Sequence, residues 1–366
     1  MDPVAAPRRI VSRAVADGAF PAAVVEVGTS TEVWWREAFG RVASGERAEA
    51  CPEGALFDLA SLTKVVVTAT LAMRLLEARR IQLADRVSVR LPAWRGEDRA
   101  RVTLLDLLEH ASGLTAYLPF YVDHIGRREY EPALCASPLE YPPRSQSIYS
   151  DLGFMLLGFI FADAGEAPLD EQFGAIGQAI GAPDLIYRPR RTWTGTIVPT
   201  EFDPWRGRLL VGDVHDENAW ALGAVAGHAG LFGTAAGVGT FARTLLRTLA
   251  GEDLLASPGT LRRFLRPSAV PGSSRALAWD TMRPTSSCGS RIAPSAFGHT
   301  GFTGTSLWVD PDRTVYIVML TNRVHPSRTN EGITQARRAL HDAVIESFDR
   351  ERAAGRAMRG RPAPEA

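Results

Sequence analysis

Two pairs of strand-like segments lie near opposite ends of this 366-residue chain, and they constrain its fold more than any other feature. Residues 22–28 (AAVVEVG) and 32–40 (EVWWREAFG) are rich in β-branched and aromatic residues and flank a short polar turn, which predicts an antiparallel hairpin. Residues 304–310 and 314–322 flank the turn PDR and predict a second hairpin, and an amphipathic helix follows within residues 331–353. The segments between the hairpins are mainly of helical type. This order predicts an α/β protein of the α+β type: one antiparallel sheet built from both ends of the chain, with an inserted helical subdomain.

We expect a single domain over residues 10–350, because a chain with 45% hydrophobic residues can bury one large core. The sheet part is expected at about residues 10–80 and 235–350, and the mainly helical part at about 81–234. Residues 351–366 are predicted to be a disordered tail.

The charge balance and the cysteines restrict the possible partners and the compartment. The formal charges cancel to +0, so the overall balance attracts neither nucleic acid nor an acidic membrane surface, and a small-molecule partner is expected. Three cysteines far apart in sequence, Cys51, Cys135 and Cys288, suit buried thiols in a reducing compartment better than a disulfide framework. Residues 1–20 contain no apolar stretch of signal-peptide length, and no run of 18 apolar residues occurs elsewhere. We therefore expect a cytoplasmic protein.

Lys64 is the only lysine among 41 positively charged side chains, so the other 40 (41 − 1) are arginines. It follows Ser61 by three positions at the start of a helix expected over residues 62–80, which places both side chains on one face. A serine hydroxyl is a weak nucleophile unless a neighbouring group takes its proton. Lysine can do so if burial lowers its pKa, whereas arginine stays protonated. The pair therefore indicates nucleophilic catalysis.

Three motifs occur in a fixed order: residues 57–64 (FDLASLTK), 149–158 (YSDLGFMLLG) and 298–311 (GHTGFTGTSLWVDP). With these motifs the chain resembles the serine β-lactamase-related family, which includes class C β-lactamases, D-alanyl-D-alanine carboxypeptidases and β-lactamase-like esterases. The resemblance covers roughly residues 10–345. It implies a β-lactamase/transpeptidase-like antiparallel sheet flanked by helices.

The resemblance also implies a role for each motif residue. Ser61 would be the nucleophile, Lys64 its partner, and Tyr149 the phenol that shuttles the proton. The backbone N–H groups of Ser61 and Phe302 would form the oxyanion hole. Gly304 would lie in the same strand as Gly301 and would likewise allow close approach to the backbone. The implied substrate-binding residues are Ser150, Asp151, His299, Thr300 and Gly301.

Two residues depart from the pattern of most β-lactamases in this group. His299 stands where those enzymes have a lysine that recognises a substrate carboxylate, and histidine gives a weaker, pH-dependent attraction. Asp151 stands where many members have asparagine, whose amide can donate to a substrate amide carbonyl, whereas an ionised aspartate only accepts. Both departures favour esters over lactams and peptides.

Other interpretations of these residues remain open. Alone, Ser61 would be a helix N-cap and Lys64 a surface residue. Tyr149 would be a core aromatic, and His299 a structural histidine. A metal site is not expected, because no HExxH-like spacing occurs among the candidates His215, Asp216, Glu217 and His228.

The expected function is that of a serine hydrolase without a cofactor, which forms an acyl-enzyme on Ser61 and acts on carboxylic esters or small amides. The nearest alternative is a D-Ala-D-Ala-type peptidase or a weak β-lactamase. An alternative of another class is a non-catalytic scaffold with the penicillin-binding fold. No GxSxG elbow and no phosphate-binding loop is present, which argues against α/β-hydrolase and nucleotide chemistry.

Overall fold

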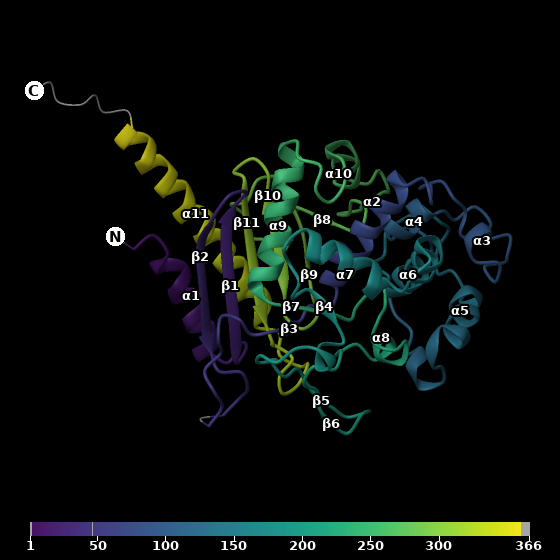
Figure 1. Cartoon of the computed structure of the whole chain (residues 1–366), viewed down its shortest axis with the longest axis horizontal. Helices are drawn as coiled ribbons and strands as arrows, with labels where there is room; N and C mark the ends of the chain where they lie inside the picture. The colour runs from purple at the N-terminus through teal and green to yellow at the C-terminus, as the bar shows by residue number, and fades with distance from the viewer. Residues whose placement is uncertain (1, 46, 360–366) are drawn as a thin grey trace, which may run out of the picture.

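A six-stranded antiparallel sheet forms the centre of the computed structural model, which describes residues 2–45 and 47–359 (Figure 1). Its strand order is β2-β1-β11-β10-β9-β8. The first and last long strands are neighbours in antiparallel register, with Ala23 opposite Thr321 and Thr29 opposite Val315. The prediction of one sheet built from both ends of the chain is therefore confirmed. The strands are β1 (Ala22–Thr29), β2 (Val33–Gly40), β8 (Asp280–Thr281), β9 (Phe297–Thr300), β10 (Ser306–Asp310) and β11 (Val315–Thr321).

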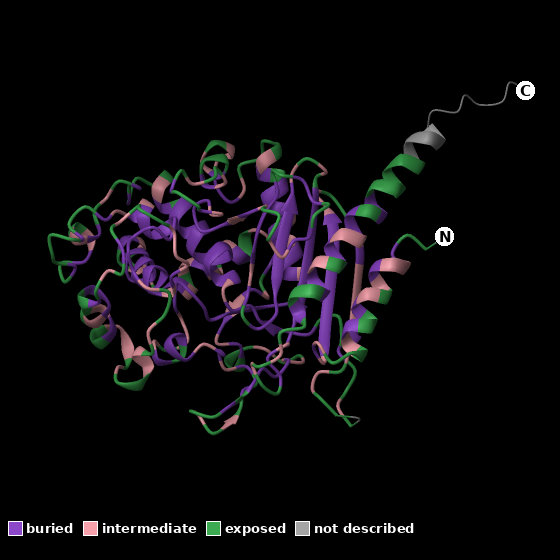
Figure 2. Ribbon diagram, turned by 180° about the vertical axis from the view of Figure 1, so that it is seen from behind, coloured by how far each residue is buried: buried purple, intermediate pink, exposed green. Residues whose placement is uncertain are grey.

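Helices cover both faces of the sheet (Figures 1 and 2). On one face lie α1 (Ala5–Ala16) and α11 (Ile333–Arg359), whose apolar side chains form one buried cluster with Val25 and Val27 of β1. On the other face lies α9 (Ala235–Ala250), which shares the larger cluster with Val24. Because alternate residues of a strand point to opposite faces, β1 is buried on both sides. α11 continues to Arg359, so the predicted disordered tail does not begin at residue 351; residues 360–366 lie outside the described part of the chain.

The second part of the molecule is formed by residues between β2 and α9. Helices occupy most of residues 104–179, as expected for a mainly helical middle part. Residues 186–234 differ from that expectation, because they form short strands and loops with one short α-helix. The strand β8, with only two residues, was also missed, because so short a segment has no readable periodicity. The remaining α-helices are α2 (Ala69–Glu77), α3 (Val87–Arg90), α4 (Leu104–Leu108), α5 (Gly126–Ala136), α6 (Asp151–Gly165), α7 (Leu169–Ala179), α8 (Glu217–Ala221) and α10 (Pro258–Phe264). The remaining strands are β3 (Phe57–Asp58), β4 (Ile186–Tyr187), β5 (Phe202–Asp203), β6 (Arg208–Leu209) and β7 (Leu231–Gly233).

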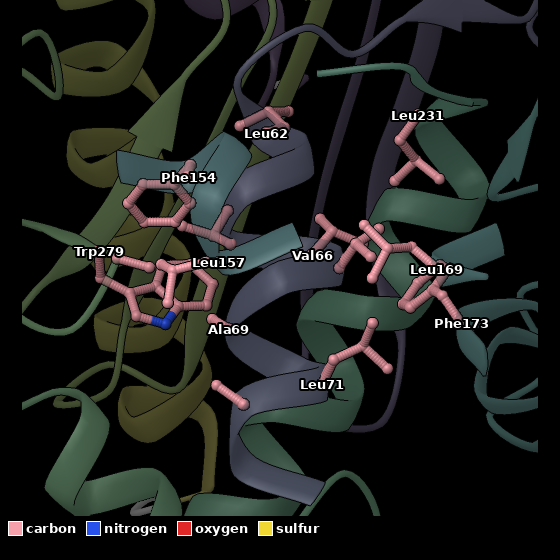
Figure 3. Close-up of a cluster of buried hydrophobic side chains, with 14 of the residues drawn as sticks. Leu62, Val66, Ala69, Leu71, Phe154, Leu157, Leu169, Phe173, Leu231 and Trp279 are labelled. Atoms are coloured by element: carbon pink, nitrogen blue, oxygen red, sulfur yellow. The ribbon is translucent and has the colours of Figure 1, made fainter. Parts of the chain in front are cut away.

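The helix α6 lies in the middle of this second part and is buried along almost its whole length. Figure 3 shows Phe154 and Leu157 of α6 in the same buried cluster as Val66 and Ala69, which follow Lys64 in sequence. Close packing of this kind holds two helices in one relative position. It therefore fixes the residues at the start of α6, Asp151 among them, relative to Ser61 and Lys64.

Within the described residues, no single helix is both long and apolar enough to cross a membrane. The bent pair of α6 and α7, which meet at 76°, passes the same test of length and composition when taken together.

Candidate active site

Ser61 lies in a tight turn between β3 and the helical segment that leads into α2. The preceding residue, Ala60, has a backbone φ of 47°, in the left-handed region that residues with a side chain seldom adopt. The Asp58 carboxylate holds this turn, because it accepts hydrogen bonds from Ala60 N (2.8 Å) and from His215 N (2.6 Å). A strained backbone persists only when its surroundings determine it, and such strain is concentrated at functional sites.

Lys64 lies one turn after Ser61 and is fully buried (0% exposed). Its Nζ donates to Ser61 Oγ (3.2 Å) and to the backbone oxygen of His228 (3.0 Å). Asp151 Oδ1 is 2.7 Å from the same nitrogen. Residues Lys64–Thr68 form a π-helical turn, a feature that is frequent at functional sites. The predicted contact between the serine and the lysine is therefore present in the structure.

The charge state of Lys64 differs from our expectation. Burial by itself lowers the pKa of Lys64, but the Asp151 carboxylate and Tyr149 together raise it above the ordinary value. The resting site therefore holds a lysine cation paired with Asp151. This pairing could not be predicted from the sequence, because the two residues are 87 positions (151 − 64) apart.

The Tyr149 side chain lies against the same lysine. Its hydroxyl oxygen is buried beside Lys64 and Ser61, both of which lower the pKa of the phenol by hydrogen bonding, although neither contact has good hydrogen-bond geometry. Lys64 Nζ is 4.8 Å from the centre of the Tyr149 ring, and the Arg275 guanidinium is 4.9 Å from it. Burial raises the pKa of the Tyr149 phenol, and the Lys64 cation opposes that shift without reversing it. The phenol of Tyr149 is therefore protonated in the resting site.

The end of β9 and the following turn lie beside the Ser61 turn. Thr303 Oγ1 donates to Asp58 O (2.7 Å), and Thr305 Oγ1 donates to Leu59 O (3.0 Å). Neither the Ser61 N–H nor the Phe302 N–H has a backbone acceptor among the described residues, so both are available as the predicted oxyanion donors. We did not predict a role for these two threonines, because hydroxyl side chains are common in turns and their hydrogen-bond partners lie far away in the sequence.

The packing of the chain itself requires both glycines of this motif. A Cβ atom on Gly301 would meet Thr305 Oγ1 and, at 2.6 Å, Leu59 O, so the turn before Ser61 packs directly against this glycine. Gly304 lies in the turn between β9 and β10, not in the strand, and its φ of 105° strongly favours glycine.

The histidine of the third motif is buried and electrically neutral at ordinary pH. Burial and the nearby Arg275 and Lys64 cations keep the pKa of His299 well below its usual range. Its Nδ1 lies 2.8 Å from Thr300 O. We expected His299 to attract a carboxylate in a pH-dependent way, and that expectation is wrong near neutral pH because the ring is neutral there.

Ser150 has a structural role in place of the expected contact with substrate. It is buried, its Oγ donates to Thr115 O (2.6 Å), and the same oxygen caps α6 by accepting from Gly153 N (3.3 Å). Its own N–H donates to Nδ1 of His110 (2.9 Å), a residue that sequence reasoning missed. The His110 ring also packs against Tyr149, with ring centres 4.8 Å apart.

A cavity of about 820 Å³ opens over these groups. Ser61, Tyr149, Asp151, His299, Thr300, Gly301 and Phe302 all line it, so the three motifs meet there. The lining also contains four arginines that we did not predict: Arg275, Arg323, Arg328 and Arg337. Arginine is so common in this chain that an arginine in the sequence does not indicate a functional site. Arg337 is only 4% exposed, burial lowers its pKa to about 10, and it forms no ion pair with a described acidic residue.

The four residues considered for a metal site have separate partners. His215 Nε2 lies 2.8 Å from Glu201 Oε2, and His228 Nε2 lies 2.8 Å from Asp216 Oδ1. Glu217 is paired with Arg328 (2.7 Å). Within residues 2–45 and 47–359, no group of three or more histidine, cysteine or acidic side chains is arranged to hold a metal ion.

The sheet, the inserted second part and a serine, lysine and tyrosine at their junction define a serine hydrolase of the β-lactamase fold. The family model described as Beta-lactamase matches residues 7–341. This chain belongs to the beta-lactamase family.

Similarity to individual proteins covers most of the chain. A putative D-alanyl-D-alanine carboxypeptidase of Salmonella gallinarum is 30% identical over 311 residues, 75% of this chain and 71% of that protein. An N-acetylmuramyl-L-alanine amidase of Bacillus subtilis is 30% identical over 362 residues, 87% of this chain and 80% of that protein. Among solved structures, EstCE1, a hydrolase with promiscuous acyltransferase activity, superimposes with a TM-score of 0.75 at 20% identity, covering 94% of this chain and 98% of that one. The fold class predicted from sequence is confirmed.

Proposed function

We propose that this protein hydrolyses carboxylic esters or small amides through an acyl-enzyme on Ser61, with esters as the preferred class. The observation that carries the preference is the ion pair between Asp151 and Lys64 (2.7 Å). A carboxylate in this position has no N–H to donate to a substrate amide carbonyl, and its charge is already engaged by the lysine. Ester hydrolysis does not need that donor.

In the proposed first step, Ser61 Oγ bonds to the carbonyl carbon while the carbonyl π electrons move onto oxygen. The Oγ proton passes to the group formed by Lys64 and Tyr149, and the N–H groups of Ser61 and Phe302 stabilise the oxyanion. Collapse of this intermediate breaks the bond to the alcohol oxygen, which leaves with the returned proton. Water then attacks the acyl-enzyme by the same route and releases the acid and free Ser61.

Accepting a proton requires that Lys64 and Tyr149 first hold one proton fewer than they do at rest. Since the pKa values of both groups are raised, the competent form gains population as the pH increases. We therefore expect kcat/KM to rise from neutral toward alkaline pH.

Replacing Asp151 by asparagine is expected to move this rise to lower pH. The substitution removes the largest contribution that raises the pKa of Lys64, while the burial that lowers it remains. The measurement is kcat/KM for one ester across neutral and alkaline pH, for wild type and Asp151→Asn. Asp163→Asn is the matched control, because it removes the same charge from the exposed end of α6, where Asp163 is paired with Arg127. An unmoved profile in Asp151→Asn would show that the ion pair does not set the charge of Lys64.

The ester preference is tested with a substrate panel. A short-chain p-nitrophenyl ester, a chromogenic cephalosporin and a D-Ala-D-Ala peptide are compared by kcat/KM on the purified protein, with Ser61→Ala as the background. We expect the ester to be turned over fastest. Turnover of the lactam or the peptide well above that of the ester would refute the preference.

A second candidate is a peptidase for substrates with a terminal carboxylate. It is favoured by Arg337, a buried cation in the cavity without an acidic partner among the described residues, and by the similarity to a protein named D-alanyl-D-alanine carboxypeptidase. The panel separates this candidate from the first. A non-catalytic scaffold is tested separately: intact mass after treatment of the folded protein with a fluorophosphonate should show one adduct, absent in Ser61→Ala.

A further inference from the structure

Aromatic side chains are gathered at one side of the cavity. Tyr121 lines the cavity, and its ring meets that of Trp205 edge to face at 4.7 Å. Trp205 in turn meets Trp220 of α8 edge to face at 5.4 Å. We call Tyr121, Trp205 and Trp220 the aromatic platform. Trp205 and Trp220 are 44% and 38% exposed. Neither tryptophan lines the cavity, so the platform meets the cavity at Tyr121.

The platform is held in place by polar groups beneath it. The Arg206 guanidinium lies 5.9 Å from the centres of both tryptophan rings, and it pairs with the buried carboxylate of Asp203. Its NH1 and NH2 donate to Val214 O and His215 O, both at 2.7 Å. The rings therefore rest on a buried, fully engaged cation.

Tyr121 is fixed independently of the tryptophans. Asn218 of α8 accepts from Tyr121 N (3.0 Å) through its Oδ1 and donates to Leu118 O (2.9 Å) through its Nδ2. The same short helix carries Trp220, so α8 joins the two ends of the platform. An arrangement fixed before binding loses little entropy when a ligand is bound.

Two further exposed aromatic residues belong to the cavity itself. Tyr117 is 41% exposed and Phe302, whose backbone N–H is a proposed oxyanion donor, is 49% exposed, and both line the cavity. Exposed aromatic residues that are continuous with a site of this volume are typical of a binding groove, since a folded chain gains nothing by leaving them in water.

We propose that the aromatic platform, which meets the cavity at Tyr121, is a subsite for an aryl group of the substrate, so that the preferred substrates are esters with a planar apolar ring that extends from Ser61 to Tyr121. The inference rests on the proposed ester hydrolysis and adds a substrate class to it. Edge-to-face and stacked contacts with fixed rings favour a planar ring over a flexible alkyl chain, because the ring loses less conformational freedom.

Trp205→Ala is the principal test, with Trp205→Phe as the variant that retains a ring. Trp34→Ala is the matched control, because Trp34 is an aromatic residue on β2 that packs against Phe348 of α11 on the far face of the sheet. For 2-naphthyl acetate and ethyl 2-naphthoate we expect Trp205→Ala to raise KM about tenfold with kcat little changed, and to leave kcat/KM for ethyl acetate unaltered. A loss for only one of the two naphthyl esters supports the subsite and assigns the ring to the alcohol or the acyl side.

A binding measurement separates this inference from the proposed function. In the Ser61→Ala background, the Kd of 2-naphthyl acetate is measured by titration calorimetry, so that the result needs no turnover. The inference is supported if Trp205→Ala raises the Kd about tenfold while Trp34→Ala leaves it unchanged. Trp205→Phe, which keeps a ring, should also leave the Kd close to that of the Ser61→Ala background. Equal Kd values in all variants, or no binding of the naphthyl ester, would overturn the subsite even if esters are hydrolysed. A change of mass in solution in Trp205→Ala without a change of Kd would assign the platform to self-association and also overturn it.

Discussion

Lys64→Arg is expected to reduce kcat for an ester by about 10²–10⁴-fold, the usual contribution of a positioned proton-transfer group. The substitution keeps the positive charge that faces Asp151, and it therefore keeps the electrostatic role of the side chain. It removes the ability to exchange a proton, because a guanidinium is not deprotonated in proteins. Both taking the proton of Ser61 and returning it to the leaving group need that exchange.

The measurement is steady-state hydrolysis of a p-nitrophenyl ester by wild type, Lys64→Arg and Ser61→Ala, with Ser61→Ala defining the floor. Because Lys64 is fully buried, the thermal midpoint and the near-ultraviolet circular dichroism of Lys64→Arg must show a folded protein before its rate is interpreted. Activity of Lys64→Arg close to that of wild type would mean that the charge of Lys64 is sufficient, and the proton-exchange role would be refuted.

Tyr149→Phe is expected to reduce kcat by about 10²–10⁴-fold with almost no loss of stability. The ring that packs against His110, Lys64 and Arg275 is retained, and only the hydroxyl is lost. That hydroxyl interacts with Lys64 and Ser61 but makes no hydrogen bond of good geometry with a described residue, so its removal costs little stability. If Tyr149 is catalytic, Tyr149→Phe loses kcat and keeps its stability; if Tyr149 is only structural, the variant keeps kcat.

Tyr130→Phe is the matched control, since the hydroxyl of buried Tyr130 donates to Asn218 Oδ1 (3.0 Å). We expect it to lower the free energy of unfolding by about 1 kcal/mol and to change kcat only slightly. Urea unfolding and ester hydrolysis are measured for both variants. If Tyr149→Phe lost stability and retained kcat, the tyrosine would be a structural residue of the core.

The terminal hairpins and the motif residues were the most predictable parts of the molecule. Residues 22–28 and 314–322 are almost continuous apolar runs, which reflect strands that are buried on both faces, and such a pattern is local in sequence. Residues 186–234 were less predictable, because the short strand β7 pairs with β3, far away in the chain, and β4 in turn pairs with β7. Local propensity says little about segments of two or three residues.

The amino-acid sequence by itself determined the kinds of chemistry available to this protein. It placed one lysine a helical turn from a serine, and it supplied a tyrosine and a glycine-rich strand end in motifs that the fold brings together. Residue type and local spacing are sufficient for this, since they decide which side chains are able to exchange protons.

Only the tertiary structure decided the charge of those groups and the shape of the site. The pKa of Lys64 depends on Asp151, 2.7 Å away in space and on another helix, and the neutrality of His299 depends on its burial near Arg275. The aromatic platform likewise combines residues from three separate segments. Electrostatic interaction and desolvation act through space over a few ångströms, and the order of residues along the chain does not contain those distances.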